Sequence, residues 1–243
     1  AIGFVTAPKL LRLYARAFRR HLRQQVPEAE LRAKLMPDYP MGCKRILISN
    51  NYYPALRRDN VEVINDGIAE IEANAIRLRD GRRIEIDTLI YGTGFAATDF
   101  LAPMRISGLD GLDLNTAWRD GAEAYLGVTV SGFPNLFMLY GPNTNLGHNS
   151  IVFMLESQVR YIMSAIGELR RKDKRWLDVR ADVQHRFNAR LQDQAERTIW
   201  NQGCNSWYKT ESGRNTNNWT GYTLSYRQAT RRLRPGDYAF NKI

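Results

Sequence analysis

The residues best suited to chemistry are two adjacent cations, Lys44 and Arg45, which end a loop rich in proline and glycine at residues 37–45. A stiff loop that fixes two cations side by side can bind an anion, and a guanidinium stays charged even where water is excluded. A surface pair of cations is the more common explanation of such a dipeptide. The local pattern alone therefore leaves anion binding and simple surface charge both open.

The three histidines form no recognisable Ser/His/Asp or Cys/His arrangement along the sequence. His21 and His185 lie on predicted helices, where an isolated histidine is usually structural or solvated. His148 is the better candidate, because it precedes the start of a predicted helix, and a helix N-terminus carries positive partial charge.

A second candidate is the segment at residues 87–95, Asp-Thr-Leu-Ile-Tyr-Gly-Thr-Gly-Phe. Its short apolar run predicts a buried strand, and Gly92 and Gly94 at the carboxyl end allow the backbone to pass close to a ligand. The spacing through Ala97 also matches G-x-G-x-x-A, a lenient dinucleotide fingerprint. That fingerprint requires a helix directly after the glycines. Here the residues up to Pro103 show no helical periodicity, so a phosphate-binding turn is not expected. A plain strand-to-loop turn remains the alternative.

A third candidate is the start of a strongly periodic helix predicted at residues 151–169. Asn149 or Ser150 is a suitable N-cap, and no acidic residue occurs in the helix before Glu156. The positive end of this helix is therefore not neutralised by its own side chains. Such an end, next to a predicted buried strand at residues 133–140, suits an anionic or electron-rich ligand.

The remaining pattern predicts the elements that must position these residues. Asp80 and Gly81 form the strongest hairpin signal, which predicts an antiparallel meander leading into residues 87–95. The aromatic-rich tail at residues 203–219 is consistent with a ligand cleft or with a flap packed over the core. Further helices are predicted at 8–25, 28–35 and 181–200, and strands at 46–49, 61–64, 68–73, 75–79 and 82–86.

The helix predicted at residues 8–25 is basic and amphipathic. Such a helix could lie on a membrane surface, although a surface helix with a solvated charged face is more common. Over the whole chain the formal net charge is +10. This charge is compatible with nucleic acid, an anionic membrane or a cofactor with several phosphates. Because the basic residues look scattered, we favour a chain that is half of a larger protein with an acidic other half.

The 243 residues suffice for one large domain or two small ones, and 44% hydrophobic residues with 25% charged residues are typical of a soluble globular protein. Cys43 and Cys204 are too few for a disulfide scaffold and have no zinc-site spacing, which favours a reducing cytosol. No apolar run approaches the roughly 20 residues of a transmembrane helix. The chain also starts without a methionine or a signal-peptide layout, as if entered in its middle.

Several motifs together carry a resemblance to a known family. Residues 87–95 resemble the D-x-x-x-x-[A/Y]-T-G-F segment of two-dinucleotide flavoproteins. More specifically, six segments occur in the same order as in Baeyer–Villiger monooxygenases, which are class B flavin-dependent monooxygenases, and together they span nearly the whole chain. These segments are Gly42–Arg45, Tyr52–Leu56, Arg58–Val61, Tyr125–Gly127, Gly132–Leu136 and Ser206–Tyr208.

The resemblance implies an α/β fold that is part of a two-dinucleotide-binding-domain flavoprotein. Residues 1–56 would be a helical segment and loop from the NADP-binding side. Residues 57–243 would be the C-terminal part of an incomplete, Rossmann-type FAD-binding domain that includes the antiparallel meander and a C-terminal flap. The resemblance covers the C-terminal portion of such enzymes only.

The resemblance also implies a reaction and roles for particular residues. The family inserts one oxygen of O2 into a ketone through a C4a-peroxyflavin, using FAD and NADPH, and gives an ester or lactone. By position, Arg45 matches the catalytic arginine, Lys44 the residue that reaches the NADP 2′-phosphate, and Trp207 an aromatic that touches the nicotinamide cofactor. Gly94 and Phe95 fall at the flavin-side turn, and Asn149, Ser150 and Ile151 begin the helix that would face the flavin.

The sequence departs from the family, because it holds neither the G-x-G-x-x-G fingerprint for FAD, nor the second fingerprint for NADPH, nor the substrate-positioning linker motif that follows it. We therefore expect a cytoplasmic enzyme fragment that needs a missing N-terminal FAD- and NADP-binding portion for activity. Its partners would be that portion, a small ketone and O2, with neither nucleic acid nor a membrane span. The alternatives are an N-hydroxylating or other class B flavin monooxygenase, which would not depend on Arg45, and a cofactor-free basic module that binds nucleic acid or membrane.

Overall fold

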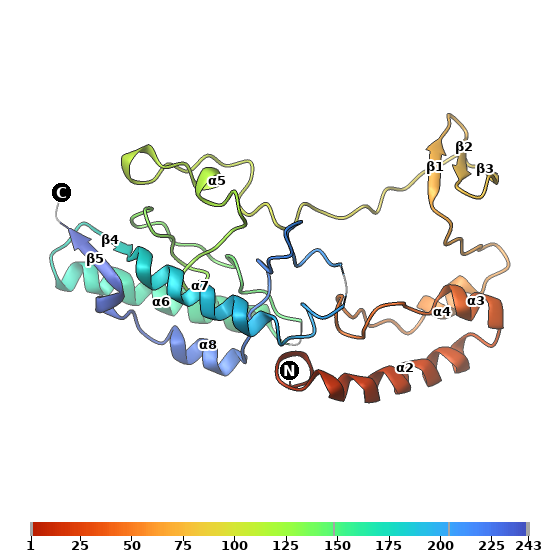
Figure 1. Ribbon diagram of the computed structural model, residues 1–243, viewed down its shortest axis with the longest axis horizontal. Coiled ribbons are helices and arrows are strands. Elements are labelled where there is room, and N and C mark those ends of the chain that lie inside the picture. The colour runs from red at the N-terminus through yellow and green to blue at the C-terminus, as the bar shows by residue number, and fades with distance from the viewer. Residues whose placement is uncertain (1, 148, 204, 242–243) are drawn as a thin grey trace. The chain divides into compact units, whose positions relative to one another are not determined.

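The computed structural model describes residues 2–147, 149–203 and 205–241. The chain divides into two compact units, and Figure 1 shows their elements. The larger unit comprises residues 1–12, 39–46 and 96–243, and the smaller unit comprises residues 13–38 and 47–95. Each unit thus combines segments from both sides of the boundary predicted at residue 56. The assignment of residues 1–56 to the NADP-binding side and of residues 57–243 to the FAD-binding domain stays a prediction.

The smaller unit contains most of α2 (Leu11–Gln25), with α3 (Ala29–Lys34), α4 (Tyr52–Leu56) and the sheet β1 (Ile68–Ile71), β2 (Ala75–Leu78) and β3 (Arg83–Glu85). The three strands pair in the antiparallel order β1–β2–β3, which confirms the predicted meander. The turn between β2 and β3 has the predicted chemistry, because Gly81 takes a φ of 91° and Asp80 Oδ1 accepts a hydrogen bond from the Arg82 amide at 3.0 Å.

Three predicted strands, which lie wholly or mostly in the smaller unit, are wrong. Residues 46–49, 61–64 and 87–92 form no regular strand in the described part of the chain. Several of their apolar side chains are exposed, among them Ile48 at 96% and Ile90 at 87%. A strand needs a neighbouring strand to satisfy its backbone, and local propensity cannot supply that neighbour.

The larger unit is built on two long helices, α6 (Ile151–Arg171) and α7 (Ala181–Ala195), as the periodicity predicts. A two-stranded antiparallel sheet joins β4 (Trp176–Val179) to β5 (Tyr238–Asn241), and neither strand is evident from the sequence. The segment at 133–140 is not a strand either: Asn135 and Tyr140 have positive φ values of 57°, which break an extended conformation. The shorter elements are α1 (Ile2–Val5), η1 (Pro8–Leu10), η2 (Leu109–Gly111), α5 (Leu114–Ala117), α8 (Thr223–Ala229) and η3 (Pro235–Asp237).

One hydrophobic core cluster of the larger unit lies between α6 and the β4–β5 sheet. Tyr161 on α6 and Leu177 on β4 are each 1% exposed, and Tyr238 on β5 is 5% exposed. The Tyr238 hydroxyl shares hydrogen bonds with the Tyr161 hydroxyl at 2.9 Å and the Thr129 hydroxyl at 3.0 Å. Buried phenols need such partners, so this group fixes how α6 meets the sheet. None of the described helices is long and apolar enough to cross a membrane.

Candidate active site

Arg45 is held at the end of its loop by a contact across 101 residues of sequence. Its Nη1 donates a 2.6 Å hydrogen bond to the main-chain carbonyl of Leu146, a fully buried residue just before α6. The loop needs glycine at position 42, where φ is 89° and an added Cβ would lie 3.0 Å from the Phe4 ring. The backbone acceptor fixes one side of the guanidinium, while Arg45 as a whole remains exposed. The side chain is therefore both oriented and accessible to an anion.

Two tyrosines surround Arg45 in the larger unit. Burial raises the pKa of Tyr208, and the nearby Arg45 charge and a hydrogen bond from its side chain only partly oppose this effect. Burial likewise raises the pKa of Tyr140, again against the Arg45 charge. Both phenols consequently stay protonated at neutral pH and add no negative charge that would neutralise the guanidinium.

Trp207 packs against Tyr208, one of the two tyrosines near Arg45. Its ring centroid lies 4.3 Å from that of the buried Tyr208, and Trp207 itself is 46% exposed. Arg45 and Trp207, two predicted site residues that are 162 positions apart, thus each lie beside Tyr208. Lys44 is also exposed, and its Nζ lies 4.4 Å from the centroid of the Tyr39 ring, a cation–π contact that leaves the ammonium open to solvent.

The N-terminus of α6 is open, as the sequence predicts, although its capping differs from the expectation. Ser150 occupies the N-cap position without a side-chain capping bond. Asn149 instead accepts a hydrogen bond from the Ser150 amide at 2.8 Å and donates one to the Thr223 hydroxyl at 3.0 Å. No acidic side chain lies in the first turn, which starts at Ile151. The positive end of a 21-residue helix thus keeps amide groups free for a ligand.

A buried amide network, which the sequence analysis missed, connects these parts. Asn143 Nδ2 donates to the Asn215 carbonyl at 2.7 Å, and Asn145 Nδ2 donates to Asn218 Oδ1 at 2.9 Å. Asn145 and Asn218 also form a parallel backbone bridge. The network ties the loop that ends in Leu146, the acceptor for Arg45, to the tail. Two asparagine-rich tracts, at residues 143–145 and 215–218, were the available signal.

One buried donor of this network has no partner. Asn218 is fully buried, and its Nδ2 makes no hydrogen bond to any described residue. The hydroxyl of Ser206, beside Trp207 and also buried, is in the same situation. Orphaned buried donors are uncommon and are usually satisfied by water or a ligand. Together with Arg45 and the α6 end, they fit a ligand rich in acceptors and negative charge, as FAD and NADP are.

Gly94 and Phe95 belong to the smaller unit and are described there alone. Gly94 has a φ of 86°, which favours glycine, and an added Cβ would meet nothing within 4 Å. Phe95 is 96% exposed. These two residues are conformationally suited to a ligand-facing turn but lack a covering contact among the described residues.

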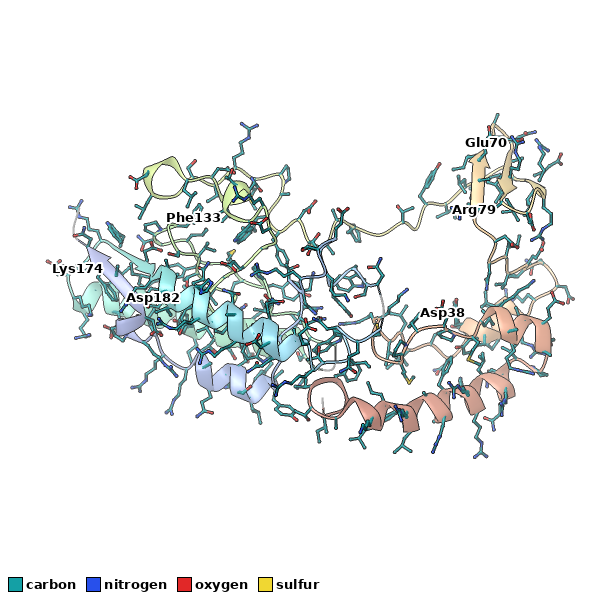
Figure 2. The ribbon with its side chains drawn as sticks, viewed as in Figure 1. Asp38, Glu70, Arg79, Phe133, Lys174 and Asp182 are labelled. Carbon is teal, nitrogen blue, oxygen red and sulfur yellow. The ribbon has the colours of Figure 1, made fainter. Side chains whose placement is uncertain are left out.

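Other candidates receive no support from the described structure. His148 lies outside the described residues. Within the described ranges, no group of three His, Cys, Asp or Glu side chains could hold a metal ion. An open cavity of about 460 Å³ in the larger unit is lined in part by Ile106, Phe133 and Leu136, and contains none of the predicted site residues; Phe133 is labelled in Figure 2.

Comparisons with known proteins agree with the resemblance read from the motifs. No family model matches the sequence. The chain is 46% identical over 239 residues to a Baeyer–Villiger monooxygenase from Pseudomonas aeruginosa, a match that covers 98% of this chain and 45% of that protein. The chain therefore spans less than half the length of this curated relative.

Two solved structures share its fold. An oxidized steroid monooxygenase bound to NADP matches with a TM-score of 0.86 and 26% identity, over 100% of this chain and 47% of that one. OTEMO in complex with FAD and NADP matches with a TM-score of 0.86 and 25% identity, over 98% of this chain and 46% of that one.

Proposed function

Because the chain belongs to the Baeyer–Villiger monooxygenase family, we propose that it forms the C-terminal portion of an FAD- and NADPH-dependent enzyme that inserts one oxygen of O2 into a ketone. The product would be an ester or lactone. The observation that carries the proposal is Arg45, a cation oriented by the Leu146 carbonyl at 2.6 Å yet still accessible.

Arg45 is suited to the difficult part of this reaction. Oxygen insertion into a ketone passes through negatively charged oxygen species in a site from which water is excluded. A fixed guanidinium stabilises such charge without reorganising, and removing one comparable donor from an enzyme typically costs about 10²–10³ in rate. The neutral state of Tyr140 and Tyr208 supports this role, because neither phenol carries a negative charge that would neutralise the cation.

The other proposed site residues would hold the cofactors. Lys44 would bind the NADP 2′-phosphate, and Trp207 would contact the nicotinamide and shape the ketone pocket. Bound FAD would supply the activated oxygen, after reduction by NADPH. Gly94 and Phe95 would lie at the flavin-side turn, and the α6 end at Asn149, Ser150 and Ile151 would stabilise negative charge on the ring.

We further propose that the chain needs an additional portion that contributes the phosphate-binding fingerprints, and that it works in the cytoplasm. Curated relatives are about twice as long as the matched region, which supports the first point. The exposed apolar residues Ile48 and Ile90 support it independently, since both occur in segments with strand-like sequence. In the absence of that portion, we expect no turnover.

The test is Arg45→Ala in the complete enzyme, measured in two half-reactions. Flavin reduction by NADPH, followed by flavin absorbance, should continue at about the parent rate. Ester formation should fall by about 10³, because the anionic species loses its cation. Arg105→Ala, which removes another exposed arginine from the larger unit, is the matched control and should leave both half-reactions intact. Undiminished ketone oxidation by Arg45→Ala would refute the assignment.

A further inference from the structure

Helix α2 carries a band of arginines that the proposed function does not use. Five arginines recur at positions i, i+4, i+7, i+8 and i+11 along this helix. At 3.6 residues per turn, that spacing confines them to an arc of about 100°. The basic residues of α2 are thus banded, and not scattered as the whole sequence suggests. This arginine band consists of Arg12, Arg16, Arg19, Arg20 and Arg23.

The helix is anchored through a different face. Leu22 is fully buried, Phe18 is half-buried, and Val26, directly after the helix, is fully buried. All five members of the arginine band are exposed. The fold therefore presents the charged arc to its surroundings while the apolar arc holds α2 in place.

The band also differs from the arginines of the antiparallel meander in lacking acidic partners. In the meander, Arg77 pairs with Glu70, which Figure 2 labels, and Arg82 pairs with Asp66 at 2.7 Å. Helix α2 contains no Asp or Glu, and no salt bridge joins the arginine band to any described residue. Five uncompensated positive charges on one helical face create a strong local potential for an anionic partner.

The surface beside the band is apolar, and this feature selects among anionic partners. Leu13 and Ala17 follow the band around the helix, and Tyr14 lies further round. Leu13 is 59% exposed and Tyr14 is 66% exposed. A polyphosphate backbone offers little to an exposed leucine, whereas a bilayer interface accepts apolar and aromatic side chains next to cations. Arginine can keep its guanidinium at the headgroups while its methylenes lie deeper.

We propose that α2 docks on the surface of an anionic phospholipid bilayer, with the arginine band on the headgroups and Leu13 entering the interface. The contact is peripheral and requires no spanning helix. It is independent of the oxygen-insertion chemistry, so either proposal can fail without the other.

The test is co-sedimentation of the complete enzyme with two kinds of vesicle: phosphatidylcholine mixed with phosphatidylglycerol, and phosphatidylcholine alone. Binding should require phosphatidylglycerol and weaken as salt increases. The triple variant R16Q/R19Q/R20Q should lose about a hundredfold in affinity, since each cation near an anionic surface contributes about a factor of five. The separate variant Leu13→Gln should bind vesicles more weakly than the parent, and the difference should persist at high salt, where the attraction between charges is screened.

The matched control is R105Q/R231Q/R232Q, which removes the same charge from exposed arginines elsewhere. It should keep nearly the parent affinity, and circular dichroism should show equal helix content in both triple variants. Equal loss in the two variants would overturn the proposal, because net charge alone would then explain binding. Tighter binding to duplex DNA than to anionic vesicles at the same salt would also overturn it, in favour of nucleic acid.

Discussion

The loop that carries Arg45 and the segment that carries Gly94 and Phe95 differ in what holds them. Arg45 is bound by the Leu146 carbonyl, whose loop is tied in turn to the tail through the amides of Asn145 and Asn218. Residues 87–95 make no backbone hydrogen bond to any described residue, and Ile90 and Phe95 are almost fully exposed. The Arg45 loop is fixed by contacts within its own unit, whereas residues 87–95 present a strand-like sequence that pairs with no strand among the described residues.

The difference follows from how each kind of structure satisfies its backbone. An irregular loop can be fixed by a few side-chain amides from its own unit, because asparagine offers both a donor and an acceptor. A strand requires a continuous row of partners from another strand. We therefore expect the environment of Arg45 to be preorganised in this chain, and that of Gly94 to depend on additional polypeptide.

The largest effect in this comparison should come from breaking the amide network. Asn218→Ala leaves the buried Asn145 Nδ2 without its acceptor, which should lower the free energy of unfolding by about 2 kcal/mol. Denaturant unfolding measures this loss. In the complete enzyme the variant should also slow ketone oxidation, because the Leu146 carbonyl that orients Arg45 is no longer fixed.

The control for that variant is Asn188→Ala, which removes another buried amide. Asn188 Nδ2 donates to the Gln184 carbonyl at 3.0 Å within α7. Its loss should destabilise the chain to a similar extent without slowing oxidation. If both variants slow oxidation in proportion to their instability, the network has no positioning role.

A smaller effect should distinguish the two units by pH. Burial raises the pKa of Asp178 in β4, so the folded chain binds this proton more tightly than the unfolded chain does. Its favourable contribution is then complete below the unfolded pKa and is lost as pH rises through the folded pKa. Asp178→Asn should remove this loss of stability, as measured by denaturant unfolding across the acidic range.

Asp80 in the smaller unit provides the opposite sign. Hydrogen bonds from the Arg82 amide and side chain lower its pKa. Its contribution is therefore present above the unfolded pKa and lost as pH falls through the folded pKa. The parent should be more stable than Asp80→Asn at neutral pH, and this difference in unfolding free energy should shrink as pH falls. For Asp178→Asn, the unfolding free energy of the variant should rise relative to that of the parent as pH rises. The same slope for both variants would contradict these assignments.

The smallest effect is expected at the exposed segment. Ile90→Ser should change the unfolding free energy of this chain by less than about 0.5 kcal/mol, because its side chain is 87% exposed. In the complete enzyme the same change should cost about 2 kcal/mol, if added strands bury this position. An equally small loss in both proteins would show that nothing covers residues 87–95.

Features of short range could be predicted from the sequence. The periodicity of α2 and α6, the Asp80-Gly81 turn and the antiparallel meander all depend on contacts within a few residues, and all are confirmed. The open N-terminus of α6 was predictable for the same reason, since it depends only on which residues occupy one turn. The motif order also predicted the family, although the roles of single residues remain proposals.

Only the tertiary structure decided which distant residues meet. The Arg45–Leu146 bond, the Asn145–Asn218 pair and the pairing of β4 with β5 join segments far apart in sequence, and no local propensity encodes them. Conversely, residues 46–49 and 87–92 have strand-like sequences that remain unpaired. A helix or a turn carries its own hydrogen-bond partners, whereas a strand or a long-range bond exists only where packing brings a second segment to it.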